Sequence, residues 1–184
     1  MRCFLTFLSL LAFCFATGRA QTTPSADEVL QAAYAKAAGE HKKVFLIFHA
    51  SWCVWCRKMD SSMNDISCKK FFDDNFVITH LVVMESKGKE DLENQGARDL
   101  LKKYKAESSG IPFWIVFDAE GNVLADAKRP PQNKNVGCPA KEEEVEYFIE
   151  VLKKIANPTG EELNTIRTRF RKNEFKRPAW VPAS

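Results

Sequence analysis

Two cysteines three residues apart, Cys53 and Cys56, have the type and spacing that most directly permit chemistry in this chain. The apolar run 44–48 precedes them, and its β-rich composition predicts a short buried strand. After Cys53, apolar residues recur at spacings of four and predict one face of a helix. Cys53 therefore lies at the expected N-terminus of a helix, where free backbone N–H groups and the helix dipole favour a thiolate.

This placement suits reversible dithiol–disulfide exchange. A cysteine at a helix N-terminus can have its pKa lowered from about 8.5 to between ~3.5 and ~7.5. Cys53 would then attack a disulfide, and Cys56, one turn on, would resolve the mixed disulfide. The pair could instead be a static structural disulfide or half of a metal site. No second Cys-X-X-Cys or His-X-X-His completes a zinc set, so we predict no metal and no cofactor.

Two marks together resemble the thioredoxin-fold oxidoreductases. One is Trp-Cys-Val-Trp-Cys at 52–56 after a strand, and the other is Ile111-Pro112 immediately before an apolar strand-like run. The resemblance covers roughly residues 25–156, and the subgroup is similar to exported bacterial thioredoxin-like proteins with a Trp-Cys-X-Trp-Cys motif. It implies that Cys53 is the nucleophile and that Pro112 is a cis-proline facing the cysteines.

The same resemblance implies a substrate-binding surface. The backbone before Pro112 is expected to pair with an extended substrate chain, in the manner of strand addition. We expect Trp52 and Trp55 to form a partly exposed apolar rim that contacts substrate, together with Ile111 and Pro112. Two alternatives stay open: either tryptophan could belong to the core, and Pro112 could be an ordinary trans-proline at a strand start.

Three features depart from thioredoxin itself. Val54 and Trp55 stand between the cysteines in place of Gly-Pro, so the redox potential does not carry over. Ile47 stands where thioredoxin has a buried acid that assists the resolving thiol. A proton acceptor for Cys56 must therefore come from elsewhere or from water. His49 replaces a tryptophan and could tune the thiols or be a satisfied structural histidine.

Cys68 and Cys138 are the cysteines that remain outside this motif and outside the N-terminal leader. Leftover cysteines in an exported protein often pair, so these two could form a second disulfide. They could equally be inert thiols, or one could relay electrons to Cys56. Cys68 starts an expected short helix and Cys138 precedes the last helix of the domain, so their contact does not follow from the sequence.

Residues 1–20 are typical of a secretory signal peptide. A basic Arg2 is followed by the apolar stretch 4–16 and by small residues at the cleavage positions before Gln21. The stretch is too short to span a bilayer comfortably, although an uncleaved anchor is the alternative. We expect Cys3 and the other leader cysteine to be removed with it. The mature protein is then exported, to the periplasm or the extracellular space, where disulfides persist.

Composition and charge limit the partners. The 184 residues are 45% hydrophobic and 28% charged, which suits one soluble domain with a proper core. Without Arg2 and Arg19 the chain holds 25 basic residues against 24 acidic ones, a balance that does not suggest a nucleic-acid partner. No later run is apolar and long enough for stable membrane insertion. The expected partners are protein thiols and disulfides and an unidentified redox partner.

The patterns along the chain predict an α/β fold of thioredoxin-like architecture. A capping box at Ser25 and Glu28 opens the first helix. We expect a roughly four-stranded mixed sheet with helices on both faces, and a domain spanning 21–157. Residues 158–184 form a helical, polar extension whose basic residues could dock on an acidic partner or face solvent. The expected helices are 26–40, 53–63, 67–74, 97–105, 141–156 and 161–175, and the expected strands are 44–48, 76–84, 113–117 and 123–125.

The leading hypothesis is an exported thiol–disulfide oxidoreductase that acts on protein substrates through Cys53 and Cys56. Reduction, oxidation and isomerisation are all compatible with the sequence. The first alternative is a non-catalytic thioredoxin-like protein-binding module with a structural disulfide. The second is a metal-binding chaperone that uses both thiolates.

Overall fold

The computed structural model describes residues 23–175, so the expected signal peptide 1–20 and the residues after 175 lie outside it. The strands are β1 (Lys43–His49), β2 (Phe76–Val82), β3 (Phe113–Phe117), β4 (Val123–Asp126), β5 (Lys128–Arg129) and β6 (Lys134–Asn135). The helices are α1 (Ala26–Glu40), α2 (Val54–Met63), α3 (Lys69–Asn75), α4 (Ala97–Lys103), α5 (Glu142–Ala156) and α6 (Gly160–Arg171), with a 3₁₀ turn, η1 (Glu90–Leu92).

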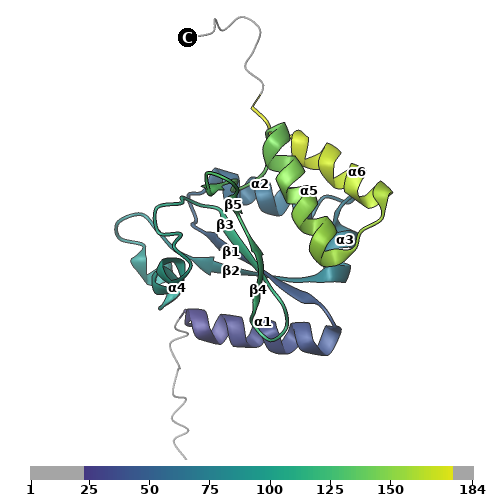
Figure 1. Ribbon diagram of the computed structural model, residues 1–184. Helices are drawn as coiled ribbons and strands as arrows, with labels where there is room; N and C mark the ends of the chain where they lie inside the picture. The colour runs from purple at the N-terminus through teal and green to yellow at the C-terminus, as the bar shows by residue number, and fades with distance from the viewer. Residues whose placement is uncertain (1–22, 176–184) are drawn as a thin grey trace, which may run out of the picture.

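The main sheet has four strands in the order β2-β1-β3-β4. β1 runs parallel to β2 and antiparallel to β3, and β4 pairs antiparallel with β3. In Figure 1, α1 lies on one side of the sheet, while α2, α3, α5 and α6 gather on the other. The prediction of an α/β fold with a four-stranded mixed sheet covered by helices on both faces is confirmed. Within residues 23–175, no helix is both long enough and apolar enough to cross a membrane.

The central strand β1 places the residues on which the site depends. Its interior residues 44–48 are all fully buried, as expected for a strand covered on both faces. The ring of Phe45 lies 6.3 Å from that of Phe148 in α5, which identifies the face toward which Phe45 points. Because side chains alternate along a strand, Ile47 and His49 point to this same face. The capping box predicted for the first helix, at Ser25, is also present.

α6 belongs to the shared core. Its apolar stripe, Leu163, Ile166 and Phe170, is buried and joins the same cluster as the sheet. The Phe170 ring lies 5.0 Å from Phe148 of α5 and 6.3 Å from Phe72 of α3. The predicted extension therefore contains a helix that packs against the rest of the domain.

Two basic residues of α6 are paired with acidic residues of the same chain. Arg167 forms an ion pair with Glu146 of α5. Arg169 Nε lies 2.6 Å from an oxygen of Asp65, just after α2. These guanidinium groups fix α6 against α5 and against the end of the helix that follows Cys53.

The segment between β4 and α5, for which the sequence predicts neither a helix nor a strand, contains regular structure. It contains the two-residue strands β5 and β6, which pair antiparallel, and a cis peptide bond between Pro130 and Pro131. Strands this short leave no alternating pattern in the sequence. A second difference is that β2 ends at Val82, whereas the prediction extended it to Met84.

Candidate active site

Cys53 and Cys56 are joined by a disulfide at the start of α2, with their Cα atoms 5.3 Å apart. Cys53 is the N-cap residue, and its backbone is extended, with φ −76° and ψ 102°. The Cys56 N–H donates toward the Cys53 sulfur at 3.1 Å. In the reduced protein, this N–H group and the helix dipole would stabilise a Cys53 thiolate.

Both sulfurs lie in a small apolar cluster and are almost inaccessible. Cys53 is 2% exposed and Cys56 is 1% exposed, and Ala50 and Ile111 pack against them. Cys53 Sγ lies 3.7 Å from the carbonyl oxygen of Ile111. The structure therefore brings the cysteine pair and the loop before Pro112 together, although 58 residues separate them in the chain.

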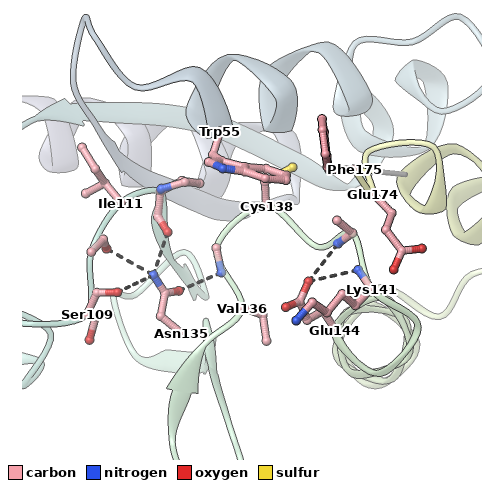
Figure 2. A pocket seen from close by; sticks show the side chains of 14 residues that line it. Trp55, Ser109, Ile111, Asn135, Val136, Cys138, Lys141, Glu144, Glu174 and Phe175 are labelled. Atoms are coloured by element: carbon pink, nitrogen blue, oxygen red, sulfur yellow. Dashed lines mark hydrogen bonds between the residues drawn. The ribbon is translucent and has the colours of Figure 1, made fainter. Parts of the chain in front are cut away.

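The loop in front of β3 is held by one amide side chain. The Ile111–Pro112 peptide bond is cis, as predicted. Asn135 Nδ2 lies 2.9 Å, 3.1 Å and 3.0 Å from the carbonyl oxygens of Ser109, Gly110 and Pro112. Figure 2 shows these bonds converging on the Asn135 amide below the loop. One amide thus fixes the backbone on both sides of Ile111.

The β5–β6 ribbon positions that amide. Asn135 Oδ1 accepts a hydrogen bond from Gly137 N at 2.9 Å, which leaves Nδ2 aimed at the loop. Gly137 has φ +52°, and a Cβ added there would lie 3.4 Å from the Pro112 carbonyl oxygen, so glycine suits this position. Asn135 is not among the residues predicted for the site, because its carbonyl partners are 23 to 26 residues away and no local sequence pattern indicates them.

Two exposed tryptophans flank the disulfide. Trp52 is 50% exposed, and its Nε1–H donates to the Met84 carbonyl oxygen at 2.7 Å. Trp55 is 42% exposed, and the Lys58 ammonium lies 4.3 Å from its ring centroid. Neither indole is part of the core, so both present apolar surface beside the cysteines.

A carboxylate anchors the turn before Cys53. Glu85 accepts hydrogen bonds from the Ser51 backbone N–H and, at 2.7 Å, from the Ser51 hydroxyl. The backbone bond from Ser51 is the main reason that the pKa of Glu85 lies below its usual value. Glu93 in turn accepts the Glu85 N–H and pairs with Arg98. The segment after β2 thus fixes the turn that carries the tryptophan rim.

A groove of about 370 Å³ opens between Trp55 and the Ile111 loop, and the cysteine that lines it is Cys138. Trp55, Ile111 and Pro112 supply apolar walls, and Lys141 and Glu144 lie at the start of α5 (Figure 2). Its volume lies within the range of about 300–1,000 Å³ that is usual for ligand pockets. The groove thus shares Trp55 and the Ile111–Pro112 loop with the surroundings of the disulfide.

A cluster with two imidazoles lies on one flank of α2. His80 Nε2 of β2 lies 2.9 Å from Asp60 Oδ1 of α2, and the His49 and His80 rings are 5.0 Å apart. Burial, together with the neighbouring His80, lowers the pKa of His49, and the charges of Asp60 and Glu85 oppose this only in part. Across residues 23–175, His, Cys, Asp and Glu side chains nowhere gather in threes around a metal-sized site.

The two other cysteines of the described chain, Cys68 and Cys138, are free and buried, and the second disulfide considered above is not formed in the structure. Burial raises the pKa of Cys138 to about 12 and raises that of Cys68. Asn173, just after α6, donates to Cys138 Sγ at 3.4 Å and to the Ser62 hydroxyl at 2.8 Å. No local sequence pattern predicts this role of Asn173, because its partners are 35 and 111 residues away.

Comparison with known proteins finds similar sequences and folds. The disulfide bond reductase DsbH of Chlamydia pneumoniae is 34% identical over 114 residues, which cover 57% of this chain and 66% of that protein, slightly less than two thirds of its length. The crystal structure of a disulphide isomerase from Xylella fastidiosa Temecula1 has 20% identity, covers 89% of this chain and 98% of that one, and has a TM-score of 0.48. A structure titled DsbH oxidoreductase has 26% identity, covers 70% of this chain and 82% of that one, and has a TM-score of 0.38.

The family match is centred on the part of the chain that carries the site. The sequence model described as thioredoxin-like matches residues 26–119, just over half of the chain. The matched region contains the Cys53–Cys56 disulfide and the cis Ile111–Pro112 peptide, which the fold brings together. The chain belongs to the thioredoxin-like family.

Proposed function

We propose that this protein is a thiol–disulfide oxidoreductase that exchanges disulfides with protein substrates through Cys53 and Cys56. The observation that carries the proposal is the disulfide at the N-terminus of α2, with the Cys53 sulfur facing Ile111. The similarity to a protein named as a disulfide bond reductase favours the reducing direction.

In that direction, the Cys53 thiolate attacks one sulfur of a substrate disulfide. The substrate S–S bond breaks, a Cys53–substrate mixed disulfide forms, and the other substrate sulfur leaves as a thiolate that takes a proton from solvent. Cys56 then loses its proton and attacks Cys53 Sγ, which closes the Cys53–Cys56 bond and releases the second substrate thiolate. Two electrons pass to the substrate, and a separate dithiol partner must reduce the pair again.

The substrate chain is proposed to lie along the loop before β3. The Ile111 N–H has no hydrogen-bond partner among residues 23–175, so it is available to an extended peptide. Trp52 and Trp55 would contact the flanking side chains, and Pro112 would shape the edge against which the peptide lies. Main-chain pairing of this kind suits many protein substrates, because it does not depend on the side-chain sequence.

The site of action is proposed to be outside the cytoplasm, in the periplasm or the extracellular space. The support is the signal-peptide pattern of residues 1–20, which lie outside the described structure. The mature chain would start near Gln21 and act without a cofactor or nucleic acid. Its substrates would be exported proteins whose disulfides are accessible.

The test is reduction of insulin disulfides by the chain from residue 21 onward, with dithiothreitol as the electron donor. Cys53→Ser should abolish the acceleration, because Cys53 is the N-cap residue whose sulfur accepts the Cys56 N–H, and Cys56 alone has no partner with which to close a disulfide. Cys138→Ala is the matched control and should retain turnover. Acceleration that survives in Cys53→Ser would refute the proposal. A measured reduction potential near about −270 mV would mark a reductant, and one near about −120 mV an oxidant.

A second candidate, a protein-binding module with a structural disulfide, is favoured by one observation. Both sulfurs are nearly inaccessible, while the two tryptophans and the groove beside them are open. In this case the disulfide would not cycle in a dithiothreitol titration. Replacing both Cys53 and Cys56 by serine would then leave partner binding intact.

A further inference from the structure

The release step proposed above requires a group that takes the proton of Cys56, and this inference rests on that proposed function. Cys56 is only 1% exposed, and burial in an apolar cluster disfavours its thiolate. The strand residue at the position of the thioredoxin acid is Ile47, which cannot accept a proton. The acceptor must therefore be another residue around α2 or water, and the burial of Cys56 favours a residue that connects the thiol to solvent.

The neighbouring strand supplies an imidazole at this position. Ile47 of β1 pairs with His80 of β2 in parallel register, so both side chains point to the same face of the sheet. His80 Nε2 lies 2.9 Å from Asp60 Oδ1, which shows that this is the face covered by α2. His49, two residues after Ile47, points the same way, and its ring lies 5.0 Å from that of His80.

Asp60 connects this cluster to the cysteine. It follows Cys56 by four residues on α2, a spacing at which Cβ atoms are about 5–6 Å apart on a helix. The side chains of Asp60 and His80 are 35% and 33% exposed. The Asp60–His80 pair therefore reaches from the neighbourhood of a buried thiol to solvent, as a proton path requires.

The other flank of α2 offers no comparable acceptor. There, Cys138 is itself a buried thiol, Lys58 donates to the Asn173 carbonyl oxygen, and Arg169 is paired with Asp65. The charged and titratable groups that surround this part of α2 are Arg57, Lys58 and Asp60 on the helix, His49 on β1, His80 on β2, Glu85 after β2, and Cys138, Glu144 and Arg169 on the far flank. Of these groups, Asp60 is the carboxylate that lies one helical turn from Cys56. It is partly exposed and bonded to His80, so the two side chains together can accept a proton and pass it to solvent.

We propose that Asp60 and His80, supported by His49, form the proton-accepting relay for Cys56 in the release step. The proton leaves Cys56 Sγ for the Asp60–His80 pair and passes from there to solvent. The thiolate that remains attacks Cys53 Sγ, so that the Cys53–substrate bond breaks and the Cys53–Cys56 bond forms. Asp60 and His80 do not act in the first step, in which Cys53 attacks the substrate.

The experiment separates the two steps. Reduced protein is mixed with oxidised glutathione, the reaction is quenched with acid at set times, and mass spectrometry distinguishes the Cys53–glutathione adduct from the closed disulfide. Asp60→Asn and His80→Gln should each slow closure by about tenfold or more near neutral pH, a modest share of what a general base can contribute. The deficit should shrink as the pH rises to about 9, where hydroxide deprotonates the thiol directly. Formation of the adduct should keep its wild-type rate.

Two further variants serve as controls. Asp65→Asn removes another carboxylate near the end of α2 and should leave both steps unchanged near neutral pH. Asp60→Glu keeps a carboxylate and should recover most of the closure rate.

Unchanged closure in both Asp60→Asn and His80→Gln, or slowing by the same factor at every pH, would overturn the relay. A wild-type chain that never forms the adduct would overturn the proposed function and the relay with it, whereas adduct formation with unaffected closure overturns the relay alone. If one variant does not fold, the other carries the test.

Discussion

The two pairs of cysteines in the described chain differ in placement and not in exposure. Cys53 and Cys56 are 2% and 1% exposed, and Cys68 and Cys138 are 1% and 5% exposed. The first pair nevertheless forms a disulfide at the N-terminus of α2, while the second consists of free thiols whose pKa values are raised by burial, even though Cys138 lines the groove. Accessibility in the resting structure therefore does not mark the reactive pair.

What distinguishes the pairs is the backbone around the sulfur. Cys53 and Cys68 both precede a helix, but only Cys53 has the extended conformation that lets its sulfur accept an N–H of the first turn. Cys68 has helical dihedral angles, φ −111° and ψ −26°, and its side chain caps nothing. Position before a helix is thus insufficient, because the N–H groups must also point at the sulfur.

Alkylation of the reduced protein should show the largest difference between the pairs. At neutral pH, a thiol with a pKa of about 12 is a thiolate only about once in 10⁵ molecules, and Cys138 is also buried. We expect iodoacetamide to modify Cys53 at least about 10³-fold faster than Cys138, as measured by peptide mass spectrometry. The ratio of the two alkylation rates should fall close to one in urea, because the unfolded backbone gives both thiols similar surroundings. A ratio within about tenfold in the native protein would break the comparison.

Removal of the amide that holds the loop facing Cys53 should have the next largest effect. Asn135→Ala leaves the carbonyl groups of Ser109, Gly110 and Pro112 without their shared donor. A misplaced loop should lower the rate of attack on a peptide disulfide by about tenfold, because small errors in positioning reacting groups are costly. Stopped-flow kinetics with a disulfide-bonded peptide would measure this. Asn122→Ala, which removes an exposed amide bonded to Asp118 in the β3–β4 turn, should leave the rate unchanged.

The corresponding amide beside Cys138 should affect stability but not chemistry. Asn173→Ala breaks the buried hydrogen bond to the Ser62 hydroxyl and the contact with Cys138 Sγ. Leaving a buried hydroxyl without its partner should lower the free energy of unfolding by about 1–3 kcal/mol. Urea denaturation would measure the loss of stability. The rate of insulin reduction, measured without urea, should stay within about twofold of the wild-type rate. A large loss of activity with unchanged stability would mean that Cys138 takes part in the exchange.

The sequence predicted the elements whose signals are local. The strand at 44–48, the helix start at Cys53 and the capping box at Ser25 each depend on residues within a few positions, so pattern and spacing sufficed. The helix 161–175 was also predicted, but not its place in the core, because the sequence does not state which surface the apolar side of a helix will cover.

The parts that could not be predicted depend on contacts between distant residues. Asn135 and Asn173 act through side-chain amides whose partners lie 23 to 111 residues away, and an asparagine in a loop has no periodicity that would reveal them. The pairing of Ile47 with His80 likewise depends on the register of two strands that are far apart in the chain. A single sequence specifies such registers only through the packing of the whole fold.

The smallest predicted effect is the loss of stability in acid at the turn that leads to Cys68. Hydrogen bonds from the Ser67 hydroxyl and backbone, followed by the ion pair with Arg169, lower the pKa of Asp65 to about 2. A carboxyl with a lowered pKa adds stability that is present above its unfolded pKa and is lost as the pH falls through the folded value. The urea midpoint of wild type should therefore exceed that of Asp65→Asn by its full amount at about pH 5 and above, and the gap should close toward about pH 2. Asp73→Asn, which removes an exposed carboxylate of α3, should shift the midpoint little at either pH. A difference in urea midpoint that persists undiminished at about pH 2 would show that the Asp65 side chain stabilises the turn without its charge. The position of the Cys68 thiol would then depend on packing and not on this ionised carboxylate.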